Sequence, residues 1–139
     1  MFRQLDDKML VSPQIAPEQV AEAAALGVTM IVNNRPDGEA PDQPAGSAIA
    51  AAAQAAGIGY RHIPVAGGFS PEQVQEMADA LAASEGKVLA FCRSGTRSSY
   101  LWALARAQEG EPADEIIGKG AAAGYDLTPL RAYLQAAGR

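Results

Sequence analysis

Residues 87–108 read KVLAFCRSGTRSSYLWALARAQ, and this stretch carries the clearest structural signal in the chain. The apolar run 87–91 is typical of a buried strand. Residues 98–108 are expected to form a helix, and their apolar side chains lie almost all the way round it, as in a helix buried in a core. The polar turn 92–97 joins the two. A strand, a tight turn and a helix predict an α/β domain, in which ligands bind beyond the carboxyl ends of the strands.

The segments on either side continue this alternation of helices and short apolar strands. Strands are expected at VTMIVNN (28–34) and GYRHIPV (59–65), and shorter β-forming pieces lie within residues 1–15. Further helices are expected over 17–26, 45–56, 71–84, 112–119 and 127–137. The pattern predicts a three-layer α/β fold with a mostly parallel central sheet flanked by helices. Residues 1–139 are expected to form a single domain, because this length is usual for one.

The composition argues against several classes of protein. The chain has 11 Lys and Arg against 16 Asp and Glu, with one Cys and one His. Its net charge of −5 disfavours nucleic acid as a partner, because phosphate contacts need clustered basic residues. One Cys allows no internal disulfide, and one Cys with one His cannot build a thiolate–imidazole zinc site, so no metal or cofactor is expected. Without a membrane-spanning run or a signal peptide in MFRQLDDKML, we expect a cytoplasmic protein with no membrane partner.

The single cysteine, Cys92, lies between the strand and the helix of the deciding stretch. The first turn of a helix presents free N–H groups and a positive dipole end, which stabilise a thiolate. Gly95 permits a positive φ that turns successive amides toward an anion. Arg97 offers a planar fork for two oxygens of an oxyanion. We therefore expect Cys92 to be a nucleophile rather than a buried core thiol, which is the commonest fate of a free cysteine.

Neighbouring residues are expected to support this site. Ser98 could donate a hydrogen bond to the sulfur and improve it as a leaving group. Arg35, after the strand 28–34, could add charge to the site, hold its loop in place, or form a surface salt bridge. His62 is expected to be structural rather than catalytic. Besides Arg35, four residues of the turn are expected to bind the substrate: Arg93, Ser94, Gly95 and Thr96.

The turn FCRSGTRSS resembles the active-site loops of two families of cysteine enzymes. Protein tyrosine and dual-specificity phosphatases carry His-Cys-x5-Arg-Ser/Thr at this place. Rhodanese-type sulfurtransferases carry a loop one residue shorter, which often reads CRSGxRS. Here the spacing is Cys-x4-Arg, and Phe91 stands where the phosphatases have histidine. The turn alone is therefore more similar to that of the sulfurtransferases.

The rest of the chain, from about Leu5 to Arg131, resembles the beta-lactamase-hydrolase-like proteins that carry a phosphatase-like domain. The segments IVNNRPDGEAPDQP and GYRHIPV carry this resemblance. The order of strand, RPDGE loop, helix and HIPV strand is also similar to that of atypical dual-specificity phosphatases. The resemblance implies a protein tyrosine phosphatase-like fold that holds a shortened, rhodanese-like loop.

A phosphatase-like hydrolase is the first function that this resemblance implies. Cys92 would attack the phosphorus of a small phosphorylated molecule or a phosphoprotein and form a thiophosphoryl intermediate. In dual-specificity phosphatases the general acid follows the HIPV strand, but here AGGF (66–69) has no carboxylate. Asp37 is the expected substitute, with Glu39 and Asp42 behind it. The Pro-Asp-Gly context explains Asp37 equally well as a turn residue.

Two other functions fit the same residues. As a rhodanese-like sulfurtransferase, Cys92 would take a sulfane sulfur from a donor, become a persulfide, and pass the sulfur to a thiol or cyanide. That chemistry needs an electropositive turn but no positioned acid. The third interpretation is a catalytically degenerate phosphatase that only binds an anionic ligand, and it rests on the missing acid.

Overall fold

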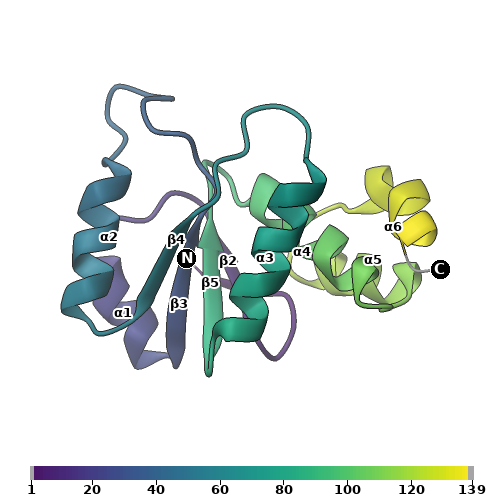
Figure 1. Cartoon of the computed structure of the whole chain (residues 1–139), viewed down its shortest axis with the longest axis horizontal. Coiled ribbons are helices and arrows are strands. Elements are labelled where there is room, and N and C mark those ends of the chain that lie inside the picture. Colours follow the sequence, from purple (N-terminus) through teal and green to yellow (C-terminus); the bar gives the residue numbers. More distant parts are fainter. Residues whose placement is uncertain (1, 138–139) are drawn as a thin grey trace.

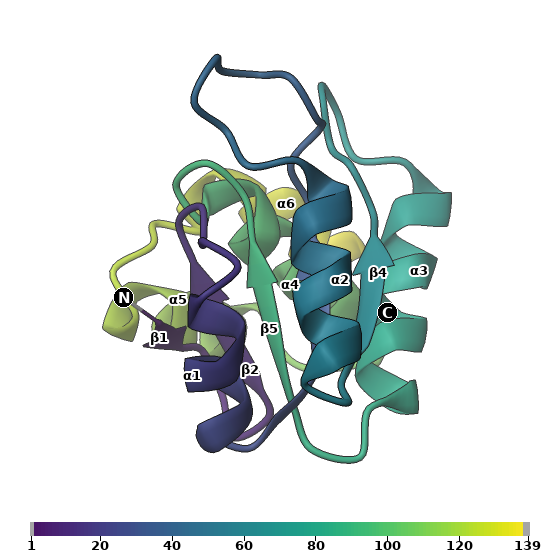
Figure 2. The same cartoon turned by 90° about the vertical axis from the view of Figure 1, so that its left-hand side faces the viewer.

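The computed structural model describes residues 2–137 as a five-stranded sheet with helices on both faces (Figures 1 and 2). The order across the sheet is β1-β2-β5-β3-β4. The pair β1 and β2 is antiparallel, and the other neighbours are parallel. The expected α/β class with a mostly parallel sheet is therefore confirmed. The strands are β1 (Arg3–Gln4), β2 (Met9–Ser12), β3 (Val28–Asn33), β4 (Gly59–His62) and β5 (Lys87–Phe91).

Helices cover the two faces unequally. The helices α1 (Gln19–Ala25) and α2 (Gly46–Ala55) pack on one face of the sheet (Figure 1). The other face carries α3 (Pro71–Ala83), α4 (Thr96–Gln108), α5 (Ala113–Ala122) and α6 (Arg131–Ala137). Each face has its own buried apolar cluster, and Leu101 and Trp102 of α4 are fully buried in the larger one. The three predicted layers are present. No helix within residues 2–137 has the length and apolar character needed to cross a membrane.

The parallel register brings the carboxyl ends of four strands into one row. Phe91 of β5 pairs with Ser12 of β2 on one side and with Asn33 of β3 on the other, and Asn33 pairs with His62 of β4. The loops that follow these strands therefore open at the same edge of the sheet, at the top of Figure 2. Cys92 comes directly after Phe91, so it lies in the middle of this edge.

Several boundaries differ from the sequence expectation for physical reasons. The helix α4 begins at Thr96, two residues early, because Gly95 adopts a φ of 94° and caps it. The strand β4 ends at His62 rather than at residue 65, because Ile63 and Val65 donate to the consecutive carbonyls of Asn33 and Asn34, whereas a regular parallel ladder uses alternate ones. The helix expected over 127–137 is divided into a 3-10 turn over 128–130 and α6.

Candidate active site

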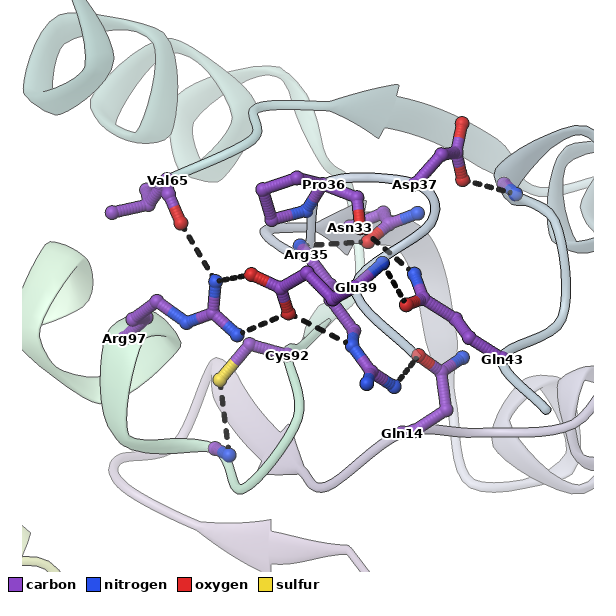
Figure 3. A network of polar contacts seen from close by, with 12 residues as sticks. Gln14, Asn33, Arg35, Pro36, Asp37, Glu39, Gln43, Val65, Cys92 and Arg97 are labelled. Atoms are coloured by element: carbon purple, nitrogen blue, oxygen red, sulfur yellow. Dashed lines mark hydrogen bonds and ion pairs between the residues drawn. The ribbon is translucent and has the colours of Figure 1, made fainter. Parts of the chain in front are cut away.

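Cys92 lies at the N-terminal end of the core helix α4. The residue is fully buried, and its Sγ accepts a hydrogen bond from the N–H of Gly95 at 3.0 Å (Figure 3). The helix has 13 residues, so the positive end of its dipole also faces this position. Both features favour a negative charge on the sulfur or on an anion bound beside it.

The turn before α4 is held from two directions. The carbonyl of Gly95 accepts hydrogen bonds from the N–H and the Oγ of Ser99, both at 2.9 Å. The carbonyl of Ser94 accepts one from the hydroxyl of Tyr125 at 3.2 Å. A Cβ on Gly95 would overlap the Tyr125 hydroxyl, and the φ of 94° itself disfavours other residues. A glycine is therefore required here both by the backbone and by the aromatic ring packed over it.

The guanidinium of Arg97 is fixed by acceptors outside its own helix. Its Nη1 donates to the carbonyl of Val65 at 2.7 Å and to Oε2 of Glu39 at 2.8 Å, and its Nη2 donates to Oε1 of Glu39 at 2.9 Å. Three of the five N–H donors of an arginine are thus engaged. The remaining two, on Nε and Nη2, share one edge of the planar group. That edge is a bidentate site for an oxyanion.

The carboxylate of Glu39 joins two arginines. Its Oε1 also accepts a hydrogen bond from Nε of the buried Arg35 at 3.0 Å. Hydrogen bonds from Arg97 hold the pKa of Glu39 at about 2, against an ordinary value of 4.5, and Arg35 acts in the same direction. The same hydrogen bonds raise the pKa of Arg97, and the neighbouring Cys92 adds to that effect. Glu39 is therefore an anion at neutral pH, which argues against it as the general acid in place of Asp37.

Arg35 fastens the loop that follows β3. Besides the ion pair with Glu39, its Nη1 donates to Oε1 of Gln14 at 3.0 Å, and its backbone N–H donates to Oδ1 of Asn33 at 2.9 Å. Figure 3 shows these contacts as one network that reaches Arg97. Of the roles considered for Arg35, the structure shows an ion pair with Glu39. This ion pair holds the loop after β3 against the site.

Asp37 lies on the same loop but faces α2. Its Oδ1 accepts a hydrogen bond from the N–H of Gly46, the first residue of α2, at 2.8 Å. Figure 3 shows its side chain turned away from Cys92. The acid role expected for Asp37 stays a prediction. His62 forms a hydrogen bond at 3.0 Å with the carbonyl oxygen of Arg35, in line with a structural role.

The hydroxyl of Ser98 does not serve the sulfur in this structure. It donates to Oδ1 of Asn34 at 2.8 Å, and Nδ2 of Asn34 donates to the carbonyl of Ile63 at 2.9 Å. Ser98 and Asn34 are both buried. The buried side-chain amide of Asn34 needs hydrogen-bond partners for both its oxygen and its nitrogen, and the hydroxyl of Ser98 is the partner of its oxygen.

The other predicted binding residues form the exposed part of the turn itself. Arg93, Ser94 and Thr96 are exposed. Oγ of Ser94 donates to Oγ1 of Thr96 at 3.1 Å. Their role in binding a substrate stays a prediction, and their exposure makes them accessible to an anion that arrives from solvent.

Three further residues take part in the site and were not expected from the sequence. Gln14 holds Arg35, Asn34 holds Ser98, and Tyr125 holds the turn. A signal was available for Asn34, because it directly follows an apolar strand and ligands bind beyond the carboxyl ends of such strands in a parallel sheet. Within residues 2–137, no group of three or more His, Cys, Asp and Glu side chains is placed to hold a metal ion.

The sheet order and the likeness to solved structures define a domain of the protein tyrosine phosphatase-like fold, which here carries a Cys-x4-Arg turn at its edge. The structure is similar to that of a candidate phosphatase from Neisseria meningitidis Z2491, with a TM-score of 0.84 and 38% sequence identity, over 97% of this chain and 96% of the other. It is also similar to Tk-PTP in its active form, with a TM-score of 0.69 over 99% of this chain and 95% of the other. At 17% identity, that second likeness concerns the fold alone.

Within this class the chain belongs to the family described as Beta-lactamase hydrolase-like protein, phosphatase-like domain, whose model matches residues 1–109. A Beta-lactamase hydrolase-like protein of Xylella fastidiosa (strain 9a5c) is 38% identical over 133 residues, 94% of this chain and 31% of the relative. The protein of the same description from Agrobacterium fabrum (strain C58) is 32% identical over 133 residues, with the same two coverages. The chain thus spans about a third of the length of these relatives. The family and fold that the sequence resembled are confirmed.

Proposed function

We propose that this domain is a cysteine-dependent, phosphatase-like hydrolase with Cys92 as its nucleophile. The observation that carries the proposal is the hydrogen bond from the Gly95 N–H to Cys92 Sγ at 3.0 Å, at the start of α4 and beside Arg97. The similarity to a candidate phosphatase at 38% identity supports it. The substrate would be a small phosphorylated molecule or a phosphoprotein.

In the first step the thiolate of Cys92 attacks phosphorus. A sulfur–phosphorus bond forms, the bond from phosphorus to the leaving oxygen breaks, and that oxygen takes a proton from water or an acid. The free edge of Arg97 and the turn amides hold the non-bridging oxygens, whose charge is spread in the transition state. In the second step water attacks phosphorus, which releases inorganic phosphate and restores the thiolate.

Access to the sulfur requires a local rearrangement. Cys92 has no exposed surface, whereas the side chain of Arg97 is 24% exposed. The arriving anion would therefore meet Arg97 first and would reach the sulfur as the side chains above it shift. The ion pair with Glu39 keeps the Arg97 edge in place during this approach.

Sulfur transfer is the second candidate, and the position of the carboxylates favours it. Glu39 is an anion and Asp37 caps α2, while a sulfurtransferase needs no acid. With thiosulfate, Cys92 would attack the outer sulfur and release sulfite, which leaves a persulfide. Attack by cyanide on that outer sulfur would yield thiocyanate and return the thiolate. An acceptor from outside is needed, because the chain has no second cysteine to resolve the persulfide.

One experiment separates these functions. The protein and its Cys92→Ser variant would each receive p-nitrophenyl phosphate and, separately, thiosulfate with cyanide. Cys92-dependent release of p-nitrophenol supports the hydrolase. Thiocyanate formation without phosphate release would overturn the hydrolase in favour of sulfur transfer. If neither rate exceeded that of the serine variant, both enzymatic proposals would be wrong and the anion-binding role would gain support.

A further inference from the structure

An apolar concavity of the described chain lies on the α3–α4–α6 side of the sheet, between the loop before α3 and the helices α4 and α6. Its volume is about 450 Å³, within the range of small-molecule sites. No charged side chain lines it. Tyr133, which also lines it, is 67% exposed and therefore accessible to a ligand from solvent. The apolar side chains around it are Phe69, Pro71, Val74, Leu104, Leu130 and Tyr133.

Helix α4 connects this cavity to the anion site. Arg97 and Leu104 are seven residues apart, so they lie on the same face of the helix, two turns and about 10 Å from each other along its axis. Tyr100 lies between them on that face. Its ring packs against Phe69, with the ring centroids 5.9 Å apart. One face of α4 thus carries Arg97, Tyr100 and Leu104 in turn, from the anion site to the apolar cavity.

The loop after β4 makes a second connection. At its start the carbonyl of Val65 accepts a hydrogen bond from Arg97 at 2.7 Å, and at its end Phe69 lines the cavity. This loop and helix α4 therefore both lead from the Arg97 guanidinium to the apolar cavity. An amphiphilic ligand, with an anion at one end and an apolar group at the other, is the chemistry that matches this arrangement.

We infer that this cavity, defined by the six apolar residues above, binds the apolar part of the substrate's leaving group. The inference rests on the proposed hydrolase function and names its substrate class, an alkyl or aryl phosphate whose apolar group reaches two turns along α4. Binding energy from such a remote group can be used to orient the phosphate at the reacting atoms. It would also draw a substrate toward a buried sulfur.

Binding to the Cys92→Ser protein tests this without turnover. Calorimetric titrations would compare ethyl phosphate with octyl phosphate, both below the critical micelle concentration. Each methylene that leaves water tightens binding about fourfold, so octyl phosphate should bind at least about tenfold more tightly than ethyl phosphate. Adding Tyr133→Ala should weaken octyl phosphate about threefold or more and leave ethyl phosphate unchanged. Leu26→Ala, at another exposed apolar side chain beyond α1, should change neither.

The outcomes separate this inference from the function on which it rests. Equal affinity for the two phosphates, or equal effects of Tyr133→Ala and Leu26→Ala, would overturn the apolar subsite and leave the hydrolase standing. If neither phosphate bound and the unmodified protein also released no p-nitrophenol from p-nitrophenyl phosphate, the proposed function itself would be wrong. Thermal unfolding of each variant would verify that it is folded.

Discussion

The carboxylate of Glu39 accepts one hydrogen bond from each terminal nitrogen of Arg97, at 2.8 Å from Nη1 to Oε2 and at 2.9 Å from Nη2 to Oε1. The two residues are 58 positions apart in the chain, so this contact ties the loop after β3 to the start of α4. Paired bonds of this kind fix the plane of the guanidinium as well as its position. The edge of Arg97 that remains free therefore has one defined orientation toward Cys92.

Glu39→Gln should lower turnover because the guanidinium of Arg97 is then no longer held in one plane. Glutamine can accept only one of the two bonds and carries no charge, so Arg97 gains alternative orientations. We expect kcat/KM for p-nitrophenyl phosphate to fall about tenfold, since small misplacements of a positioning group are costly. Glu76→Gln, which makes the same charge change on the exposed surface of α3, is the control. Equal kcat/KM in both variants would contradict the positioning role.

The same substitution should make stability less dependent on pH. The pKa of Glu39 is about 2 in the folded protein, below the ordinary 4.5, so its ionisation stabilises the fold above pH 4.5. This contribution is lost as the pH falls from 4.5 toward 2. For so exposed an ion pair we expect the free energy of unfolding to drop by about 1 kcal/mol or less in Glu39→Gln at pH 7. At pH 3, urea unfolding should show that this difference in free energy of unfolding between the unmodified protein and Glu39→Gln is less than half its value at pH 7. A difference that stayed constant between the two pH values would refute the lowered pKa of Glu39.

Local patterns predicted the frame of the site, whereas contacts between distant segments had to come from the structure. The strand 87–91 and the turn after it follow from residue type and spacing, and the structure has that strand with the same bounds. The role of Glu39 depends on Arg97, which only the fold brings near. Tyr125 is a similar case, because nothing in its own neighbourhood indicates that it lies over Gly95. Ser98 was assigned to the sulfur because it is near Cys92 in sequence, but a buried amide has the stronger need for its hydroxyl.

Tyr125→Phe should weaken the turn without emptying the space over Gly95. The ring remains, but the carbonyl of Ser94 loses the hydroxyl that donates to it at 3.2 Å. A looser turn presents the Gly95 N–H less well to Cys92 and to a bound anion, so kcat/KM for p-nitrophenyl phosphate should fall, by less than the roughly 10²- to 10³-fold lost when such a donor is removed outright. Steady-state kinetics would measure the fall. Tyr133→Phe is the matched control, and an equal kcat/KM in the two variants would show that Tyr125 does not position the turn.

Ser98→Ala should act on stability more than on chemistry. The variant leaves Oδ1 of Asn34 buried without its donor, which costs about 1–3 kcal/mol. Urea unfolding would measure that loss against Ser47→Ala, an exposed serine of α2. Turnover by the folded fraction should be retained. A large fall in kcat with unchanged stability would instead return Ser98 to the role at the sulfur that its sequence position suggested.

Asp37→Asn removes the acidic proton that a general acid would supply and keeps the shape of the side chain. The amide oxygen of asparagine can still accept the hydrogen bond from the Gly46 N–H, so the start of α2 should keep its cap. Since Asp37 faces away from Cys92, we expect unchanged kcat for both p-nitrophenyl phosphate and phenyl phosphate, and an unchanged melting temperature. Asp37→Ala removes the cap as well and should cost about 1 kcal/mol of stability.

Phenyl phosphate makes this comparison decisive, because its leaving group is the poorer one and depends more on protonation. A positioned acid typically contributes about 10²- to 10⁴-fold to a rate. If Asp37→Asn lowered kcat for phenyl phosphate about 100-fold or more at unchanged stability, and far less for p-nitrophenyl phosphate, Asp37 would be the acid. The loop after β3 would then have to swing its carboxylate from Gly46 toward Cys92 in the course of the reaction.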